Sequence, residues 1–296
     1  MNSLFSFFLL LFLFQGLVAD KHISTKFLNP SRVTQLSWHP RIFIYKGFLS
    51  DEECEHLIEL GKDKLKPSMV THSDSGKITF TKQRTSSSTF LHKHQDEIVT
   101  RIEERIATWT FLPEENGEVL QILHYGHGEK YDPHLDFFID KVDPKPSGHR
   151  VATVLMYLSD VKKGGETVFP YLKEKHAQKQ ADVSWSDCAK TGYAVKPVKG
   201  DALLFFSLHP NTSTDLMTLH GSCPVIDGEK WSATKWIHLR TFEVPERSTT
   251  SGKCDDENDL CSFWAAAGEC TKNHKYMIGS KKSPGFCRSS CNACIS

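Results

Sequence analysis

Short apolar runs, separated by Gly, Pro and Asp, follow one another through residues 119–242, and they constrain the fold more than any other feature of the sequence. Runs of this length between turn residues are typical of β-strands. Many short strands in succession favour an antiparallel barrel or jelly roll. The predicted strands are residues 119–123, 151–158, 167–169, 194–195, 202–206 and 236–242.

Two helices and one further strand are predicted before this region. The first strand lies within residues 40–48. Ser50 and Glu53 form the pattern of a capping box, which predicts a helix that ends at about residue 65. Apolar residues at helical spacing predict a second helix from residue 95 to about 111. The chain is therefore expected to be α+β and mainly β, with helices that support the strands.

His134-Leu135-Asp136 is the best-placed metal-binding pair in the sequence. In an extended segment, side chains two residues apart point to the same face, so an imidazole and a carboxylate can converge on one metal. One more histidine would complete the facial triad of non-haem Fe(II) oxygenases, which leaves positions open for oxygen and a co-substrate.

Two other pairs compete with it, in a chain that has 15 histidines. His94 and Asp96 lie at the start of the predicted second helix, where side chains two residues apart diverge by about 200° around the axis. His127 and Glu129 lie in a predicted turn beside two glycines, which fixes their geometry poorly. Neither pair is expected to chelate a metal as well as His134 and Asp136.

His220 is the candidate for the third ligand, shortly after the predicted strand that ends at Phe206. Lys230 follows ten residues later, whereas neither His209 nor His238 has a basic residue at that offset. On a hairpin this spacing brings the lysine ammonium over the metal pocket, where it can bind a carboxylate as a point charge.

Four motifs, in this order, resemble those of the prolyl 4-hydroxylases, and the similarity is greatest to plant enzymes of the secretory pathway. The motifs are Tyr125-x5-Tyr131-x2-His134-x-Asp136, residues 164–170 (Gly-Gly-Glu-Thr-Val-Phe-Pro), residues 200–206 (Gly-Asp-Ala-Leu-Leu-Phe-Phe), and His220 with Lys230. The similarity covers about residues 40–243. It implies a double-stranded β-helix (jelly roll), a catalytic domain at residues 40–246 and an oxygenase core at about residues 117–243.

The resemblance also implies roles for individual residues. His134, Asp136 and His220 would bind iron, Lys230 would bind the distal carboxylate of 2-oxoglutarate, and Thr167 would contact the same co-substrate. Enzymes of this family use Fe(II), 2-oxoglutarate, O2 and ascorbate. They hydroxylate C4 of peptidyl proline and release succinate and CO2.

A groove for the peptide is implied by the same resemblance, lined by Tyr125, Tyr131, Arg150 and Trp236. The alternative is that the tyrosines and Trp236 are core aromatics with a polar tip. Residues 67–89 are polar and predict an exposed loop or an edge hairpin, and a plain surface loop is a simpler interpretation than a lid over the cleft.

Six of the nine cysteines fall within residues 254–294, after a Ser/Thr/Gly-rich linker at residues 247–253. This density predicts disulfides and an oxidising compartment, although spacing alone leaves the connectivity open. The spacing resembles that of a ShKT domain, which implies three pairs. They are Cys254–Cys294, Cys261–Cys287 and Cys270–Cys291. In the catalytic domain Cys188 and Cys223 are candidates for a further disulfide, which would leave Cys54 as a buried thiol.

Residues 1–19 are largely apolar and predict either a cleaved signal peptide or an uncleaved signal-anchor that would hold the protein at the membrane. Either one places the rest of the chain in the lumen of the endoplasmic reticulum or, alternatively, the Golgi. Asn211-Thr212-Ser213 is then a candidate glycosylation site.

The charge gives no argument for a nucleic-acid partner, because 36 Lys and Arg balance 36 Asp and Glu. The expected partners are proline-rich peptides or proteins, with cell-wall glycoproteins of the extensin or arabinogalactan type as the natural substrates. Two other functions stay open. One is a 2-oxoglutarate oxygenase that acts on lysine or another residue, and the other is a catalytically silent binding protein. The sequence does not indicate an oligomeric state.

Overall fold

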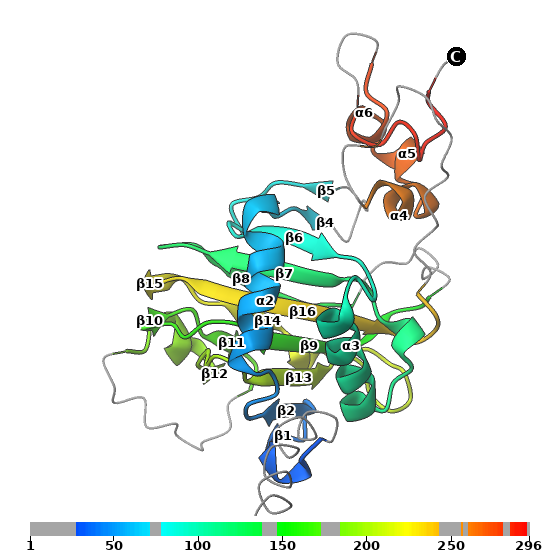
Figure 1. The fold of residues 1–296 in the computed structure, drawn as a ribbon. Helices are drawn as coiled ribbons and strands as arrows, with labels where there is room; N and C mark the ends of the chain where they lie inside the picture. The colour runs from blue at the N-terminus through cyan, green and yellow to red at the C-terminus, as the bar shows by residue number, and fades with distance from the viewer. Residues whose placement is uncertain are drawn as a thin grey trace, which may run out of the picture.

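The computed structural model describes residues 28–71, 78–137, 147–172, 184–242, 256, 260–280 and 285–294 (Figure 1). Two antiparallel sheets form the body of the protein, and two α-helices lie against the larger sheet. The described residues therefore confirm the predicted strand-rich jelly roll with helical support.

The larger sheet has eight antiparallel strands in the order β1-β2-β13-β9-β16-β7-β6-β3. Four of them differ from the sequence-based prediction, because β1 and β3 were not predicted and β6 and β16 lie elsewhere than predicted. Strand β6 lies partly within the polar segment predicted as an exposed loop or an edge hairpin, and it lies near the edge of the sheet. Strand β16 begins at Lys230 rather than at residue 236. The bounds are β1 Val33–Ser37, β2 Ile42–Tyr45, β3 Lys66–Pro67, β6 Ser87–Leu91, β7 Leu120–Tyr125, β9 Arg150–Tyr157, β13 Ala202–Phe206 and β16 Lys230–His238.

The smaller sheet has four antiparallel strands in the order β12-β11-β14-β8. Their bounds are β8 Tyr131–His134, β11 Thr167–Phe169, β12 Tyr193–Val195 and β14 His220–Ser222. Two antiparallel two-strand pairs complete the strands. They are β10 (Lys163–Gly164) with β15 (Val225–Asp227), and β4 (Val70–Thr71) with β5 (Ile78–Thr79). Gly164 has φ +80°, and a Cβ there would lie 2.2 Å from the Pro224 carbonyl oxygen. Only a glycine therefore fits this close approach of the two backbones.

The two faces of the larger sheet have separate cores, as the period of two along a strand requires. Val154 and Met156 of β9 belong to the cluster under the helices, whereas Tyr157 belongs to the cluster shared with Phe169 of the smaller sheet. The functional side chains described below lie on this second face. The sheets therefore enclose the site from both sides.

Helices α2 (Asp51–Gly61) and α3 (Glu97–Thr110) cover the outer face of the larger sheet. The capping box at Ser50 and Glu53 forms as predicted. Asp96 caps α3 by accepting hydrogen bonds from two backbone N–H groups. The short 3-10 helices are η2 Pro30–Arg32, η3 Lys62–Lys64, η4 Glu114–Asn116, η5 Cys188–Thr191 and η6 Leu216–Thr218.

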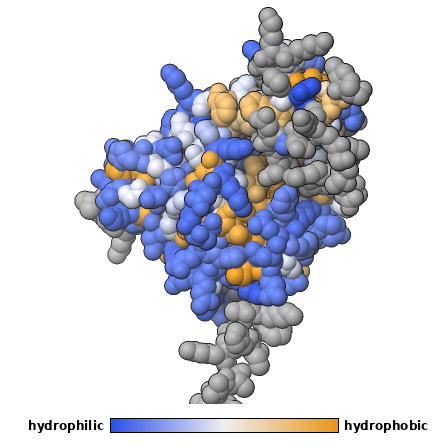
Figure 2. All heavy atoms as spheres, turned by 45° about the horizontal axis from the view of Figure 1, so that its top comes forward, coloured by the Kyte–Doolittle hydropathy of each residue, from blue (hydrophilic) through white to orange (hydrophobic). Residues whose placement is uncertain are grey.

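The C-terminal part contains three short helices, α4 (Cys261–Ala266), α5 (Glu269–Lys272) and α6 (His274–Met277). Disulfides join Cys261 to Cys287 and Cys270 to Cys291, which are two of the pairs implied by the ShKT resemblance. Cys254 of the third pair lies outside the described residues. The face seen in Figure 2 is mostly hydrophilic, with a narrow band of apolar side chains across it.

Within the catalytic part, Cys188 and Cys223 form a disulfide and Cys54 is a buried free thiol. Asn211 is exposed in a turn after β13, where its side-chain oxygen accepts hydrogen bonds from Ser213. The predicted targeting segment, residues 1–19, and the linker, residues 247–253, lie outside the described residues. Across the part of the chain that is described, no helix has the length and apolar character needed to span a membrane.

Candidate active site

The smaller sheet brings His134, Asp136 and His220 together. His134 ends β8 and His220 begins β14, and the two residues are paired in the register of these neighbouring strands. Nε2 of His134 lies 3.6 Å from Oδ1 of Asp136, and Nε2 of His220 lies 3.7 Å from Oδ2. One ligand atom from each residue lies within 4.8 Å of the others. The three residues singled out from the sequence thus converge on one point.

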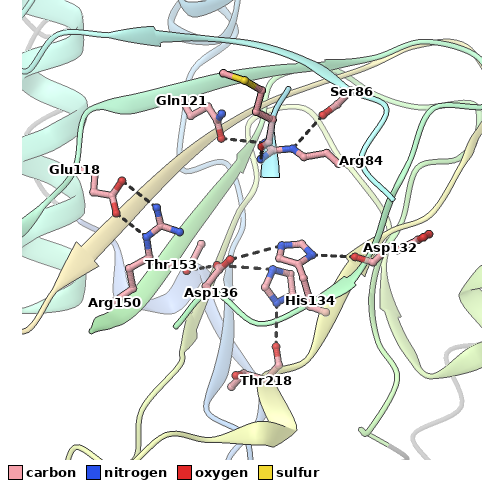
Figure 3. Close-up of polar contacts among 12 residues, drawn as sticks. Arg84, Ser86, Glu118, Gln121, Asp132, His134, Asp136, Arg150, Thr153 and Thr218 are labelled. Atoms are coloured by element: carbon pink, nitrogen blue, oxygen red, sulfur yellow. Dashed lines mark hydrogen bonds and ion pairs between the residues drawn. The ribbon is translucent and has the colours of Figure 1, made fainter. Parts of the chain in front are cut away.

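Backbone contacts fix the orientation of both imidazoles. Nδ1 of His134 donates to the Asp132 carbonyl and Nδ1 of His220 donates to the Thr218 carbonyl, each at 2.9 Å (Figure 3). Because Nδ1 carries the proton, Nε2 keeps a free lone pair toward Asp136. Burial, reinforced by the neighbouring His220, lowers the pKa of His134 to about 3, so that ring is neutral at physiological pH.

Asp136 is ionised and held in place. Burial alone would raise its pKa, but His220 and His134 lower it below the usual carboxyl range. The Thr153 hydroxyl donates to Oδ2 of Asp136 at 2.6 Å (Figure 3). Two imidazoles and one carboxylate, each oriented by a second hydrogen bond, are the donor set that suits a divalent iron.

A cavity opens beside these three residues, and its lysine end is formed by Tyr125, Thr167, Ser222 and Lys230. Lys230 is only 1% exposed, and its Nζ donates to the Ser222 hydroxyl at 2.8 Å. Burial lowers the pKa of Lys230 to about 7, although Glu166 acts in the opposite direction. A buried ammonium among hydroxyl groups favours an anion, and a carboxylate bound there would raise this pKa again.

Tyr125 lies at this lysine end. It pairs directly with Lys230 across β7 and β16, and its ring centroid is 5.2 Å from the Lys230 Nζ. Thr167 also lines the cavity, and its hydroxyl is 2.8 Å from that of Tyr157. The structure therefore places Tyr125 beside the candidate co-substrate residues, although the resemblance assigned it to the peptide groove.

The arginine end of the cavity is formed by Arg84, Tyr131 and Trp236. Arg150 does not line the cavity itself but stacks on the Trp236 ring. The Arg150 guanidinium lies 3.9 Å above the Trp236 ring, and two of its nitrogens donate to Glu118 at 2.5 and 3.0 Å (Figure 3). His238 lies 2.8 Å from the same carboxylate. Burial would raise the pKa of Glu118, but Arg150 and His238 lower it strongly. The carboxylate is therefore a fixed anchor for Arg150.

Two groups at this end are available to a ligand. The Trp236 Nε1 is buried and has no hydrogen-bond partner within the described residues. Tyr131 stacks on His134, with Arg84 on its other face. A buried N–H without a hydrogen-bond partner costs free energy. A bound group that carries a carbonyl oxygen would accept a hydrogen bond from the Trp236 N–H and remove that cost.

The sequence analysis did not identify Arg84, Glu118, Thr153 or His238 as parts of the site. Arg84 lies in the segment predicted as an exposed loop or an edge hairpin, and its place follows from the β-bridge to Tyr131 of β8. Thr153 is an ordinary β-strand residue, so only the pairing of the strands reveals its contact with Asp136. Local sequence carries no signal for contacts of this kind.

The competing pairs have other roles. Asp96 caps α3, and the His127 Nδ1 faces the Ile226 carbonyl. His94, Glu103 and Glu114 form a second group with metal-like spacing, but Glu103 is already ion-paired with the buried Lys235.

The sequence is similar to a defined enzyme superfamily and to individual proteins. The profile of the 2OG-Fe(II) oxygenase superfamily matches residues 120–238. The chain is 60% identical over 268 residues to probable prolyl 4-hydroxylase 7 of Arabidopsis thaliana, covering 90% of this chain and 84% of the relative. It is 62% identical over 268 residues to probable prolyl 4-hydroxylase 6 of the same plant, covering 90% and 91%.

One solved structure also resembles this fold. It is the viral collagen prolyl hydroxylase of Paramecium bursaria Chlorella virus-1, in complex with 2OG. The TM-score is 0.50 at 27% sequence identity, and the match covers 67% of this chain and 95% of the viral chain. The matched fold agrees with the two-sheet architecture around the cavity.

Proposed function

The chain belongs to the prolyl 4-hydroxylases within the 2OG-Fe(II) oxygenase superfamily, and on this premise we propose that it hydroxylates peptidyl proline at C4. The reaction uses O2 and 2-oxoglutarate and releases succinate and CO2. The observation that carries the proposal is a single cavity that joins a two-histidine, one-carboxylate set to a buried lysine and an aromatic, arginine-bearing wall.

The metal would be held by His134, Asp136 and His220. When bound there, Fe(II) supplies the oxidising chemistry that couples decarboxylation of 2-oxoglutarate to hydroxylation of the peptide. The protein's part is to hold both imidazoles in one orientation through the Asp132 and Thr218 carbonyls. Ascorbate would serve this reaction as the reductant, as the family resemblance implies.

The co-substrate would lie between the metal ligands and the lysine end. Protonated Lys230 would pair with the distal carboxylate of 2-oxoglutarate, and Thr167 would contact the same group. Tyr125, which lies over Lys230 Nζ, is assigned here to the co-substrate rather than to the peptide. Burial of this end excludes water, which strengthens the charge pair.

The peptide would lie against the arginine end. Proline offers a rigid apolar ring and no N–H, so recognition rests on aromatic surface and on donors to the peptide carbonyls. Tyr131 and Trp236 supply the surface, while Arg150 and the Trp236 Nε1 supply donors. Glu118 keeps the Arg150 guanidinium in one plane, so little conformational entropy is lost on binding.

The substrates and compartment follow from the same proposal. Disulfides in both parts of the chain are expected in an oxidising compartment, which supports the endoplasmic reticulum or the Golgi. Residues 1–19 would direct the chain there as a signal peptide or as a membrane anchor, residues 254–294 would form a ShKT domain, and Asn211 would carry a glycan. Proline-rich extensin or arabinogalactan proteins would be the substrates.

Succinate production tests the proposal. The purified protein is supplied with Fe(II), ascorbate, 2-oxoglutarate and O2, with a proline-rich peptide or a matched lysine-rich peptide. Succinate formation that depends on the proline peptide supports the proposal. Formation only with the lysine peptide favours a lysine oxygenase, and no peptide-dependent succinate favours a silent binding protein.

A further inference from the structure

The C-terminal module, residues 260–280 and 285–294, touches the catalytic part at two places. Met69 packs against the core of the module, which is built from Cys261, Trp264, Met277 and Cys287. The ring of Phe263 lies against that of Phe242, with centroids 5.1 Å apart. Figure 1 shows α4 beside the β4–β5 pair, in agreement with the Met69 contact.

The Met69 contact leads to one wall of the arginine end. Met69 lies between β3 and β4, in the segment that we call the entrance hairpin (residues 66–71 and 78–86). Its carbonyl accepts a hydrogen bond from the Arg84 guanidinium at 3.2 Å. Arg84 in turn lies 4.7 Å over the Tyr131 ring. The module therefore supports the segment that positions Arg84 on Tyr131.

The entrance hairpin has few other supports at its tip. At its base, Lys66 and Pro67 pair with β6, and the backbone near Arg84 bonds to residues 130 and 132 of the β8 region. Strands β4 and β5 pair only with each other within the described residues. A two-stranded hairpin is marginally stable by itself, so packing from the module fixes its position.

The Phe263 contact leads to the other wall. The Phe242 ring lies 4.8 Å from that of His238, and the Lys93 ammonium donates to the Phe242 carbonyl at 3.0 Å. His238 contacts Glu118, the carboxylate that anchors Arg150. The two module contacts thus lead to both walls of the arginine end, whereas Lys230 and Thr167 lie at the other end of the cavity.

We propose that the C-terminal module positions the peptide-binding walls through Phe263 and Met69, and so sets the affinity for the peptide but not for 2-oxoglutarate. The inference rests on the proposed function, because it takes the arginine end as the peptide site. Phe263 and Met69 are positioning residues, since they act through Phe242 and Arg84. Loss of one aromatic contact is expected to weaken peptide binding by about twofold to tenfold.

The test compares three variants of the full chain. Phe263→Ala removes the contact with Phe242. Met69→Ala removes the contact between the entrance hairpin and the module, and it changes no residue of the module. Phe286→Ala is the matched control, because it removes another aromatic ring of the same module, one that stacks on Tyr276. The measurements are KM for a proline-rich peptide, KM for 2-oxoglutarate, and amide hydrogen exchange of the whole chain.

The expected result is a higher KM for the peptide in Phe263→Ala and Met69→Ala, an unchanged KM for 2-oxoglutarate, and a normal Phe286→Ala. In Met69→Ala, exchange should rise in residues 66–71 and 78–86 and not in β7. Unchanged exchange in that hairpin, or an equal rise throughout the chain, would overturn the inference. The exchange measurement needs no substrate, so it decides the matter even if the wild-type chain fails to hydroxylate the peptide, which would overturn the proposed function instead.

Discussion

The ring of Tyr131 lies flat on the ring of His134, with centroids 3.6 Å apart and planes 16° from parallel. The Arg84 guanidinium covers the opposite face of Tyr131, 4.7 Å from its centroid. One aromatic side chain therefore touches both the proposed metal-binding group and the proposed peptide wall. Packing of this kind would couple the position of the proposed metal ligand His134 to that of a peptide bound against Tyr131.

Tyr131→Ala should weaken peptide binding while Tyr131→Phe largely preserves it, because the phenylalanine ring retains both stacking contacts. The expected increase in peptide KM for the alanine variant is about twofold to tenfold. Steady-state kinetics with varied peptide measures it. Equal effects of the two substitutions would show that the phenol hydroxyl, and not the stacked ring, is what matters.

Thr153→Ala should lower the affinity for Fe(II) by about tenfold to a hundredfold, the usual effect of losing a hydrogen bond to a metal ligand. The hydroxyl of Thr153 holds Oδ2 of Asp136, so its loss frees the carboxylate to rotate. Thr153→Ser keeps the hydroxyl and should restore most of the affinity. Anaerobic titration calorimetry with Fe(II) gives the comparison, and equal affinities for all three proteins would remove this role from Thr153.

Affinity for 2-oxoglutarate should depend on pH through Lys230. Its pKa is lowered to about 7 in the free protein, and a bound carboxylate raises it, so binding takes up a proton. Affinity is then full below about pH 7 and falls as the pH rises above that value, by up to about tenfold per unit. Calorimetry over this range checks the direction.

Lys230→Ala supplies the control for the pH experiment. It should weaken binding by about tenfold to a hundredfold, the usual range for a hydrogen bond to a charged group, and should abolish the pH dependence above pH 7. Unchanged binding in this variant would show that the carboxylate binds elsewhere.

Arg150→Lys should raise the peptide KM although the charge is kept. A lysine ammonium cannot make the planar two-point contact with Glu118 or stack on Trp236 as the guanidinium does. The KM for 2-oxoglutarate should stay unchanged because Lys230 is at the other end of the cavity. A lysine variant that behaves as wild type would mean that charge alone is required.

The proposed metal-binding group could be singled out from the sequence because His134 and Asp136 lie two residues apart, and because Lys230 distinguishes His220 from other histidines. Its surroundings could not. Glu118 and His238 are 120 residues apart in the chain, and only the antiparallel pairing of the strands brings them to one arginine.

The same reason explains the differences in the strands. Strand β16 begins with Lys230, and every second residue from there, Ser232 and Thr234, is also polar, buried and part of the cavity lining. Because these residues are polar, this part of the strand does not form an apolar run and was not predicted. Strand β6 is likewise rich in Ser and Thr, and its pairing with β7 supplies the backbone hydrogen bonds that define it.

Proline 4-hydroxylation is tested most directly by mass spectrometry of a proline-rich peptide. The peptide is first incubated with the protein, Fe(II), 2-oxoglutarate, ascorbate and O2. We predict the mass gain of one oxygen atom, located on proline by fragmentation and identified as 4-hydroxyproline after hydrolysis, with His134→Ala inactive and His127→Ala active. Two results would contradict proline 4-hydroxylation. One is an oxygen atom located on lysine, and the other is no mass gain with the wild-type chain although it binds 2-oxoglutarate.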